Sequence, residues 1–346
     1  MRIITRYICY FIILIAIAGL VKAANVGSNT TVSIQPTAAL GGGLNAILAF
    51  GALDNGFNFA ANTDTCTFGS YFPVSSAVSL NGGVLSLGQD FICVQPIRFP
   101  TGGTILGNGN SFTLGETTTD FVLTASLNFN ATILQFDTNT RLYGILQFAQ
   151  NCKIRGTTGK VLTLENGSAL VVRPNSQLII EDVTLSNLGT TNVRCLMDNG
   201  SLILRNVILA CSANYTFSRG SILFDKDVVF TGTTTFAYTS GIGSTINTLS
   251  TLMFDHDTTF SYAPRNARGN LLNMIDNTSC LYLSGCTLFS TYTGLQLQTG
   301  TLLLDDQVTM TSTGRNTGES ILLNSSLTTK VMGGSTVYMY GRIKYQ

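Results

Sequence analysis

A short pattern that recurs along the second half of the chain is the feature that most constrains its fold. Residues 201–209 give one copy: a small residue, an apolar pair separated by one position, a polar bend at Arg205 and Asn206, and a second apolar pair. Related copies cover residues 221–230, 251–260 and 301–310. Because side chains alternate between the two sides of a strand, each copy predicts two short strands that meet at a bend.

The shortness of these strands requires the copies to stack. A pair of strands of about three residues cannot bury its apolar side alone, so each copy needs a neighbour of the same shape, as in a solenoid. We therefore expect the first apolar residue of each copy to lie on that of the copy before it. These residues are Leu178, Leu202, Ile222, Leu252, Leu281, Leu302 and Val337.

A third apolar segment precedes several copies, at residues 195–197, 271–274, 295–297 and 321–323. This predicts three short strands per coil, and the unequal spacing of the copies indicates loops of different length on a constant core. The pattern begins near residue 81, and the run Gly107, Asn108, Gly109 predicts a tight turn with positive φ. Between residues 121 and 154 apolar pairs recur about every six residues, which is typical of a β-helix with short coils.

Residues 81–345 resemble the right-handed parallel β-helix superfamily, the pectin-lyase-like fold of polysaccharide lyases, phage tailspikes and autotransporter passenger domains. The resemblance is carried by runs such as Ile105 to Gly109 and Val183 to Asn187. It implies an all-β, right-handed parallel β-helix with three short strands per coil over residues 81–346. Because unrelated functions share this scaffold, the resemblance indicates architecture only.

The N-terminus has the features of an export signal. Arg2 and Arg6 precede an uncharged apolar run, residues 7–21, which ends in small residues near Ala23. A transmembrane helix is the alternative, but it usually needs about 20 apolar residues. We expect residues 1–23 to be a cleaved signal peptide, the mature protein to be secreted to the cell surface, periplasm or medium, and no integral membrane segment to remain.

Residues 24–80 differ in character from the repeats. A Gly-rich stretch at 41–43 precedes an apolar run at 44–50 that fits either a short amphipathic helix or a strand. We expect this region to be an N-terminal cap, because the exposed end of a solenoid invites unwanted pairing. A disordered leader is the alternative interpretation.

Composition excludes some classes of partner. Charged residues make up only 11% of the chain and the formal net charge is +1, with no basic cluster. Nucleic acids and anionic membranes both demand clustered Lys and Arg, so neither is an expected partner. No phosphate loop, nucleophile elbow or cofactor motif is present, and we expect no cofactor and no bound metal.

The cysteines are expected to be buried free thiols. One of the eight, Cys9, lies in the signal region, and the odd remainder shows no paired spacing that would suggest disulfides or a zinc site. By alignment of the copies, Cys93 takes the place of Leu209, while Cys152 and Cys286 take that of Val207. Only Cys280 and Cys286 are near enough in sequence to suggest a pair.

The best catalytic candidates are acidic residues at the bends. Asp225 and Asp227 occupy the same place in their copy as Asp255 and Asp257, with His256, the only histidine, between the latter two. If the copies stack, four carboxylates come within one or two coil spacings of about 4.8 Å, where they can catalyse hydrolysis or bind Ca²⁺.

Pectin-degrading members of the superfamily use such carboxylates, and residues 342–344 are similar to the Arg-x-Lys of its hydrolases. The paired-Asp and Gly-His-Gly motifs of those hydrolases are absent around His256, however, and Arg342 lies far along the chain. We therefore expect a non-enzymatic, adhesin-like or structural role, with glycans or a host or envelope surface as partner, or self-association through the solenoid ends. A polysaccharide lyase or glycoside hydrolase is the alternative.

Overall fold

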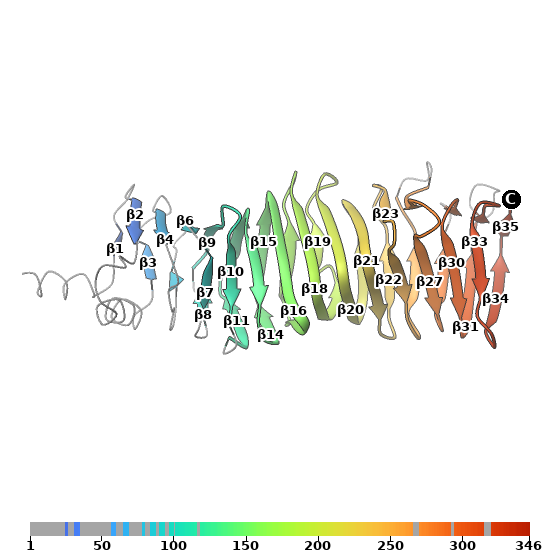
Figure 1. Cartoon of the computed structure of the whole chain (residues 1–346), viewed down its shortest axis with the longest axis horizontal. Coiled ribbons are helices and arrows are strands. Elements are labelled where there is room, and N and C mark those ends of the chain that lie inside the picture. Colours follow the sequence, from blue (N-terminus) through green and yellow to red (C-terminus); the bar gives the residue numbers. More distant parts are fainter. Residues whose placement is uncertain are drawn as a thin grey trace, which may run out of the picture.

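The computed structural model is a parallel β-solenoid of about ten turns (Figure 1). It describes residues 101–115, 118–265, 270–291, 294–314 and 320–346, together with short segments between residues 25 and 99. Within these residues there are strands but no helix. The predicted all-β architecture of stacked parallel coils is confirmed.

Each coil contributes one strand to each of three faces. The first face holds β2 (Thr31–Ile34), β4 (Thr65–Phe68), β6 (Val84–Leu87), β9 (Gly103–Leu106), β12 (Leu127–Asn130), β15 (Ile145–Ala149), β17 (Ala169–Val172), β19 (Val193–Cys195), β22 (Thr235–Tyr238), β25 (Thr259–Tyr262), β28 (Thr287–Ser290), β31 (Gln307–Ser312) and β34 (Thr336–Gly341). The second face holds β7 (Phe91–Cys93), β10 (Ser111–Leu114), β13 (Ile133–Phe136), β23 (Ser244–Ile246), β26 (Leu272–Met274), β29 (Leu295–Leu297), β32 (Ile321–Leu323) and β35 (Ile343–Tyr345). The third face holds β8 (Ile97–Phe99), β11 (Asp120–Leu123), β14 (Thr140–Tyr143), β24 (Thr251–Phe254), β27 (Cys280–Ser284), β30 (Thr301–Asp305) and β33 (Thr328–Val331).

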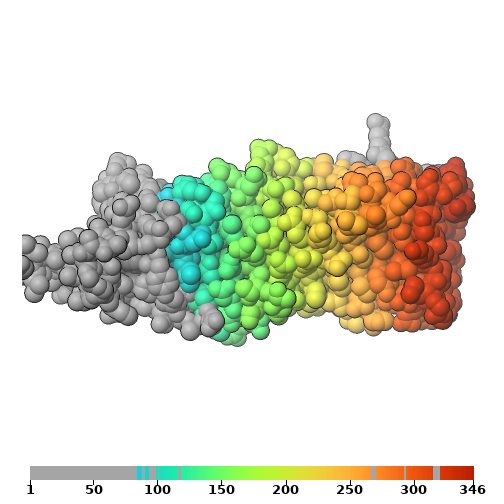
Figure 2. Space-filling model, in the orientation of Figure 1, coloured from blue at the N-terminus to red at the C-terminus, as the bar shows by residue number. Residues whose placement is uncertain are grey.

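Four longer strands bend from the second face onto the third without a break: β16 (Asn151–Leu164), β18 (Gln177–Thr190), β20 (Ser201–Phe217) and β21 (Ser221–Thr231). The last residues of β20, Tyr215 to Phe217, pair with β22 and so belong to the first face. Each corner is named after the face that precedes it. The first corner joins the first face to the second, the second corner joins the second face to the third, and the third corner joins the third face to the first face of the next coil. Figure 2 shows that the colours follow the sequence along the long axis of the rod, from residues near 100 to the C-terminus.

The core consists of inward side chains that stack from coil to coil. Leu202 pairs in register with Leu178 below it and Ile222 above it, and all three are buried. Phe230, Phe236, Phe254 and Phe260 form a stacked block, in which the Phe254 and Phe260 ring centroids lie 4.4 Å apart. The buried residues form one continuous apolar cluster along the rod.

Buried hydroxyl groups satisfy backbone carbonyls where the chain turns. Thr258 Oγ1 donates to the carbonyl of Gly232, and Ser279 Oγ to that of Asn247, each over 2.9 Å to the neighbouring coil. Asp182, Asn206 and Lys226 occupy the second corner with φ between 51° and 66°. A buried carbonyl without a hydrogen-bond partner would destabilise the fold. Ser and Thr side chains at the corners therefore stabilise the turns by donating to these carbonyls.

The register differs from the sequence expectation after residue 231. Leu252 stacks on Val228 of the third face and not on Ile222, because an additional strand, β23, covers Ile222 and Phe224 on the second face. Val337 likewise stacks on Val308 of the first face and not on Leu302. The copies that begin at residues 251, 280 and 301 therefore start one face later around the solenoid, and the copy that contains Val337 starts two faces later.

The described cysteines are free, as expected, but all three alignments of cysteines with positions in the copies were wrong. Cys152 is inward on the second face in register with Leu178, not with the third-face position of Val207, and Cys286 lies at the third corner. Cys93 pairs with Leu114 of the second face, not with the third-face column of Leu209.

Burial raises the pKa of Cys195 and of Cys286 to about 12 and that of Cys211 to about 11, so these thiols stay protonated at neutral pH. Cys280 is partly buried.

The predicted signal peptide, residues 1–23, lies outside the described residues. In the predicted cap, residues 24–80, β2 pairs with β4 and β4 with β6 in the sheet of the first face. A separate three-stranded sheet contains β1 (Asn25–Val26), β3 (Phe57–Phe59) and β5 (Val78–Ser79). The apolar run 44–50 lies outside the described residues, and in the described part of the chain no helix has the length and apolar character to cross a membrane.

Candidate functional site

The two acidic bends predicted as one site lie at opposite edges of the third face. Asp225 and Asp227 flank the second corner, whereas Asp255, His256 and Asp257 form the third corner. Asp227 pairs in register with Thr251, not with Asp257. The prediction that four carboxylates stack at one corner is wrong, because Leu252 continues the column of Val228.

Asp225 belongs to a ladder of charges along the second corner. The Arg205 guanidinium lies 2.7 Å from Asp225 and 3.3 Å from Glu181, and Lys153 lies 2.9 Å from Glu181 on its other side. Asn247 donates to Asp225 over 3.2 Å. Burial opposes ionisation of Asp225, but the hydrogen bonds from Arg205 and Asn247 outweigh it and lower its pKa. This carboxylate therefore has a structural role.

Replacement of Arg205 by alanine is expected to lower the free energy of unfolding by about 2 kcal/mol, because two largely buried carboxylates lose their shared cation. The measurement is urea denaturation followed by circular dichroism. Since the folded-state pKa of Asp225 is lowered, its stabilisation is present above the ordinary pKa of aspartate and is lost as pH falls through the folded value. The deficit of the variant should therefore shrink in acid.

Arg141→Ala is the matched control. Arg141 pairs with Asp120 over 2.8 Å between adjacent coils in the same way, but both side chains are exposed to solvent. An exposed pair contributes little, so this variant should be much closer to wild type. Equal losses for the two arginines would contradict the role assigned to the ladder.

His256 lies among carboxylates at the third corner. Its Nε2 is 3.8 Å from Asp255 Oδ1, and its Nδ1 is 3.5 Å from Asp306 Oδ2, two coils further on. Gly285, whose φ is +55°, occupies the corresponding corner of the coil between them. A Cβ atom at this position would clash with His256 Nδ1. The absence of a side chain at Gly285 lets the imidazole lie over this corner and approach Asp306.

Asp305 is held beside this cluster. The Tyr282 hydroxyl donates to its Oδ2 over 2.7 Å, and Ser335 Oγ lies 3.2 Å from its Oδ1. The hydrogen bond from Tyr282 is the main reason that the pKa of Asp305 is lowered. Arg342 and Lys344, in contrast, lie at the second-face end of the last coil, where Lys344 pairs with Leu322. The structure does not bring them to His256.

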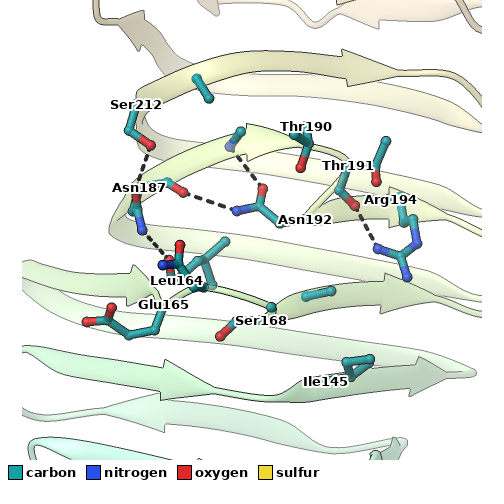
Figure 3. A pocket seen from close by; sticks show the side chains of 15 residues that line it. Ile145, Leu164, Glu165, Ser168, Asn187, Thr190, Thr191, Asn192, Arg194 and Ser212 are labelled. Carbon is teal, nitrogen blue, oxygen red and sulfur yellow. Dashed lines mark hydrogen bonds between the residues drawn. The ribbon is translucent and has the colours of Figure 1, made fainter.

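A pocket of about 330 Å³ lies at the third corner, several coils before His256 (Figure 3). The loop from Asn187 to Asn192 forms one wall, and the turn from Glu165 to Ser168 forms the other. Ile145 and Ala169 contribute apolar groups to the lining, which also includes Arg194 and Ser212. The lining is mostly amide and hydroxyl groups with one carboxylate and one guanidinium.

Hydrogen bonds fix this lining in place. Asn187 donates to the carbonyl of Leu164 over 2.7 Å and accepts from Ser212 over 2.6 Å, so it ties three coils together. The side-chain amide of Asn192 donates to the carbonyl of Asn187 and accepts from the backbone N–H of Gly189. Arg194 Nη1 donates to the carbonyl of Thr191 over 2.8 Å, and a guanidinium has further N–H groups for a ligand. The pocket is thus largely preformed.

No protein-family model matches the chain, and neither the curated proteins nor the solved structures include a match. The site must therefore be judged from its own geometry.

Sequence reasoning missed both the pocket and a row of outward apolar side chains on the third face. The pocket depends on the loop 187–192, and the only sequence signal was the longer spacing between Leu178 and Leu202 than between Leu202 and Ile222. The apolar row consists of Ile208, Val229, Met253, Tyr282 and Leu303, which pair in register through five successive coils. The sequence pattern did not predict this row, because it placed the copy at residues 251–260 over Ile222 on the second face and so separated Met253 from Val229.

Proposed function

We propose that this protein is an exported, non-enzymatic β-solenoid with an adhesin-like role, which binds a carbohydrate in the pocket at the third corner. Membership of the right-handed pectin-lyase-like superfamily and export through residues 1–23 are part of this proposal. The observation that carries it is the rigid polar lining between the loop 187–192 and the turn 165–168.

The chemistry of the lining suits a hydroxyl-rich ligand. A sugar offers donors and acceptors in a small volume, and Glu165, Thr190 and Thr191 provide the complementary groups at the rim. Arg194 adds a cation for an acidic sugar, while Ile145 and Ala169 add a small apolar part to the lining. A pocket of this size is at the small end of the usual range for ligands, about 300–1,000 Å³, which suits a short segment of a glycan.

The test is co-sedimentation of the mature protein with a panel of neutral and acidic polysaccharides, with new chain ends assayed in the same samples. We expect binding without cleavage, and a loss of affinity of about tenfold in Arg194→Ala, as for a hydrogen bond to a charged group. Arg173→Ala, at an exposed arginine outside the pocket, is the matched control and should bind like wild type. Absence of binding to the whole panel, or wild-type binding by Arg194→Ala, would reject the pocket.

A polysaccharide lyase or glycoside hydrolase is the second candidate, favoured by the position of His256 between Asp255 and Asp306. If this cluster is catalytic, new chain ends should form with wild type and disappear in Asp306→Asn and His256→Gln. Asp225→Asn should retain activity, because Asp225 is engaged with Arg205 at another corner. Chain ends that persist in Asp306→Asn would exclude this cluster.

A further inference from the structure

The third face carries an outward apolar row flanked by carboxylates that have no Lys or Arg partner among the described residues. The third-face row, Ile208, Val229, Met253, Tyr282 and Leu303, runs along the rod at one residue per coil. Ile208 is 43% exposed and the other four are half-buried against their neighbours. Five aligned apolar side chains on a solvent-facing sheet are more than the scattered exposed residues of an ordinary surface.

Carboxylates flank this row on both sides. Asp227 lies at the edge next to the second corner, and Asp255 and Asp305 lie at the edge next to the third. Within the described residues, none of the three has an ion pair with Lys or Arg, and the tyrosine hydroxyl of the row bonds Asp305. Two exposed lysines lie nearby, Lys226 beside Asp227 and Lys330 in register with Leu303 at the end of the row. Neither forms an ion pair with the three carboxylates among the described residues, so these carboxylates keep negative charge available to a partner.

We propose that the third face is a docking surface for a basic amphipathic helix of another protein, laid along the solenoid axis. Coils stack about every 4.8 Å and a helix rises about 5.4 Å per turn, so apolar side chains on one side of a helix can meet successive members of the row. Lysine or arginine on either flank of that helix would face Asp227 on one edge and Asp255 and Asp305 on the other.

The carboxylates at the edges of the third face disfavour two other partners, a second copy of this protein and an anionic membrane. In a symmetric pair of this protein joined through the third face, the acidic edges of the two copies would meet each other and repel. An anionic membrane would be repelled in the same way. The proposal is independent of the carbohydrate pocket, which lies at the third corner of earlier coils.

The test is fluorescence anisotropy with a labelled synthetic peptide of about 18 residues, built from Leu and Lys so that one side of its helix is apolar. The controls are a Leu/Glu peptide of the same pattern and a scrambled Leu/Lys peptide. We expect binding of the first peptide alone, weakened at higher salt because the charge pairs are exposed.

Variants of the protein locate the surface. Met253→Thr with Leu303→Thr, and Asp227→Asn with Asp255→Asn, should each weaken binding by about tenfold or more. Ile203→Thr with Leu223→Thr removes a comparable outward apolar pair on the second face, where Arg205 neutralises the adjacent carboxylates, and should bind like wild type. Unchanged circular dichroism and thermal midpoints would show that all variants fold.

Three outcomes would overturn the proposal. These are no binding of the Leu/Lys helix, equal binding of the Leu/Glu or scrambled peptide, and equal loss of binding in the third-face and second-face variants.

Discussion

Replacement of Phe254 by alanine is expected to lower the free energy of unfolding by about 4 kcal/mol. Phe254 is fully buried, and its ring lies 5.1 Å from that of Phe230 in the coil before and 4.4 Å from that of Phe260 on the next face along the chain. Its loss opens a cavity inside the rod and removes both ring contacts. Because coils contact only their neighbours, the cavity cannot be closed by more distant segments.

The measurement is urea denaturation of wild type and variant, with hydrogen exchange to locate the effect. Exchange should accelerate first in β21, β22, β24 and β25, the strands that carry the ring stack. Phe289→Ala is the matched control, since Phe289 points outward from β28 and is half-buried on the first face. Similar losses for the two phenylalanines would show that the assigned inward and outward sides are wrong.

Replacement of Leu288 by aspartate is expected to cost at least about 5 kcal/mol at neutral pH. Leu288 is fully buried and stacks between Phe260 and Met310, so the variant loses the leucine and places a carboxyl in an apolar interior. Phe289→Asp, one residue later and on the opposite side of the same strand, should cost far less because its carboxylate stays in water.

The pH dependence of Leu288→Asp gives a second check. Burial raises the folded-state pKa of the new carboxyl, so the folded protein takes up a proton more readily than the unfolded chain. The deficit of the variant should therefore be largest at neutral pH and smaller in acid. A deficit independent of pH would indicate that the carboxyl reaches solvent.

Alternation within a strand is a local property, and the sequence therefore predicted it well. The pattern at residues 201–209 identified Leu202 and Leu204 as inward, and both are buried. The turn at Asn108 and Gly109 has the predicted positive φ values, 54° and 87°. The third strand of several coils, at 272–274, 295–297 and 321–323, was also predicted.

Which face a strand occupies is not a local property. The copies at 221–230 and 251–260 look alike because an apolar pair, a bend and a second apolar pair fit any two adjacent faces. Only the step length distinguishes them: the step from Val228 to Leu252 equals that from Leu178 to Leu202, whereas the step from Ile222 to Leu252 is longer. The short strand β23, Ser244–Ile246, takes up the difference.

The misplaced face also explains why the candidate site changed. Placing Leu252 on Ile222 brought Asp255 over Asp225 and suggested a cluster of four carboxylates. In the structure Asp225 is bound by Arg205, while His256 meets Asp306, a residue that the sequence alignment had not linked to it. The pocket beside Asn187 depends on a loop conformation, for which no pattern in the sequence provides a rule.

The most direct test of the fold and of the third-face surface is oxidative cross-linking of engineered cysteines, with Cys280 replaced by serine. In the structure Val229 and Met253 are neighbours in register, so Val229→Cys with Met253→Cys should form a disulfide across adjacent coils. Mass spectrometry after chymotryptic digestion would identify it. Leu223→Cys with Met253→Cys, the pair that the sequence alignment would place together, should remain reduced. A disulfide in the Leu223 pair and none in the Val229 pair would contradict the register on which the third-face row depends.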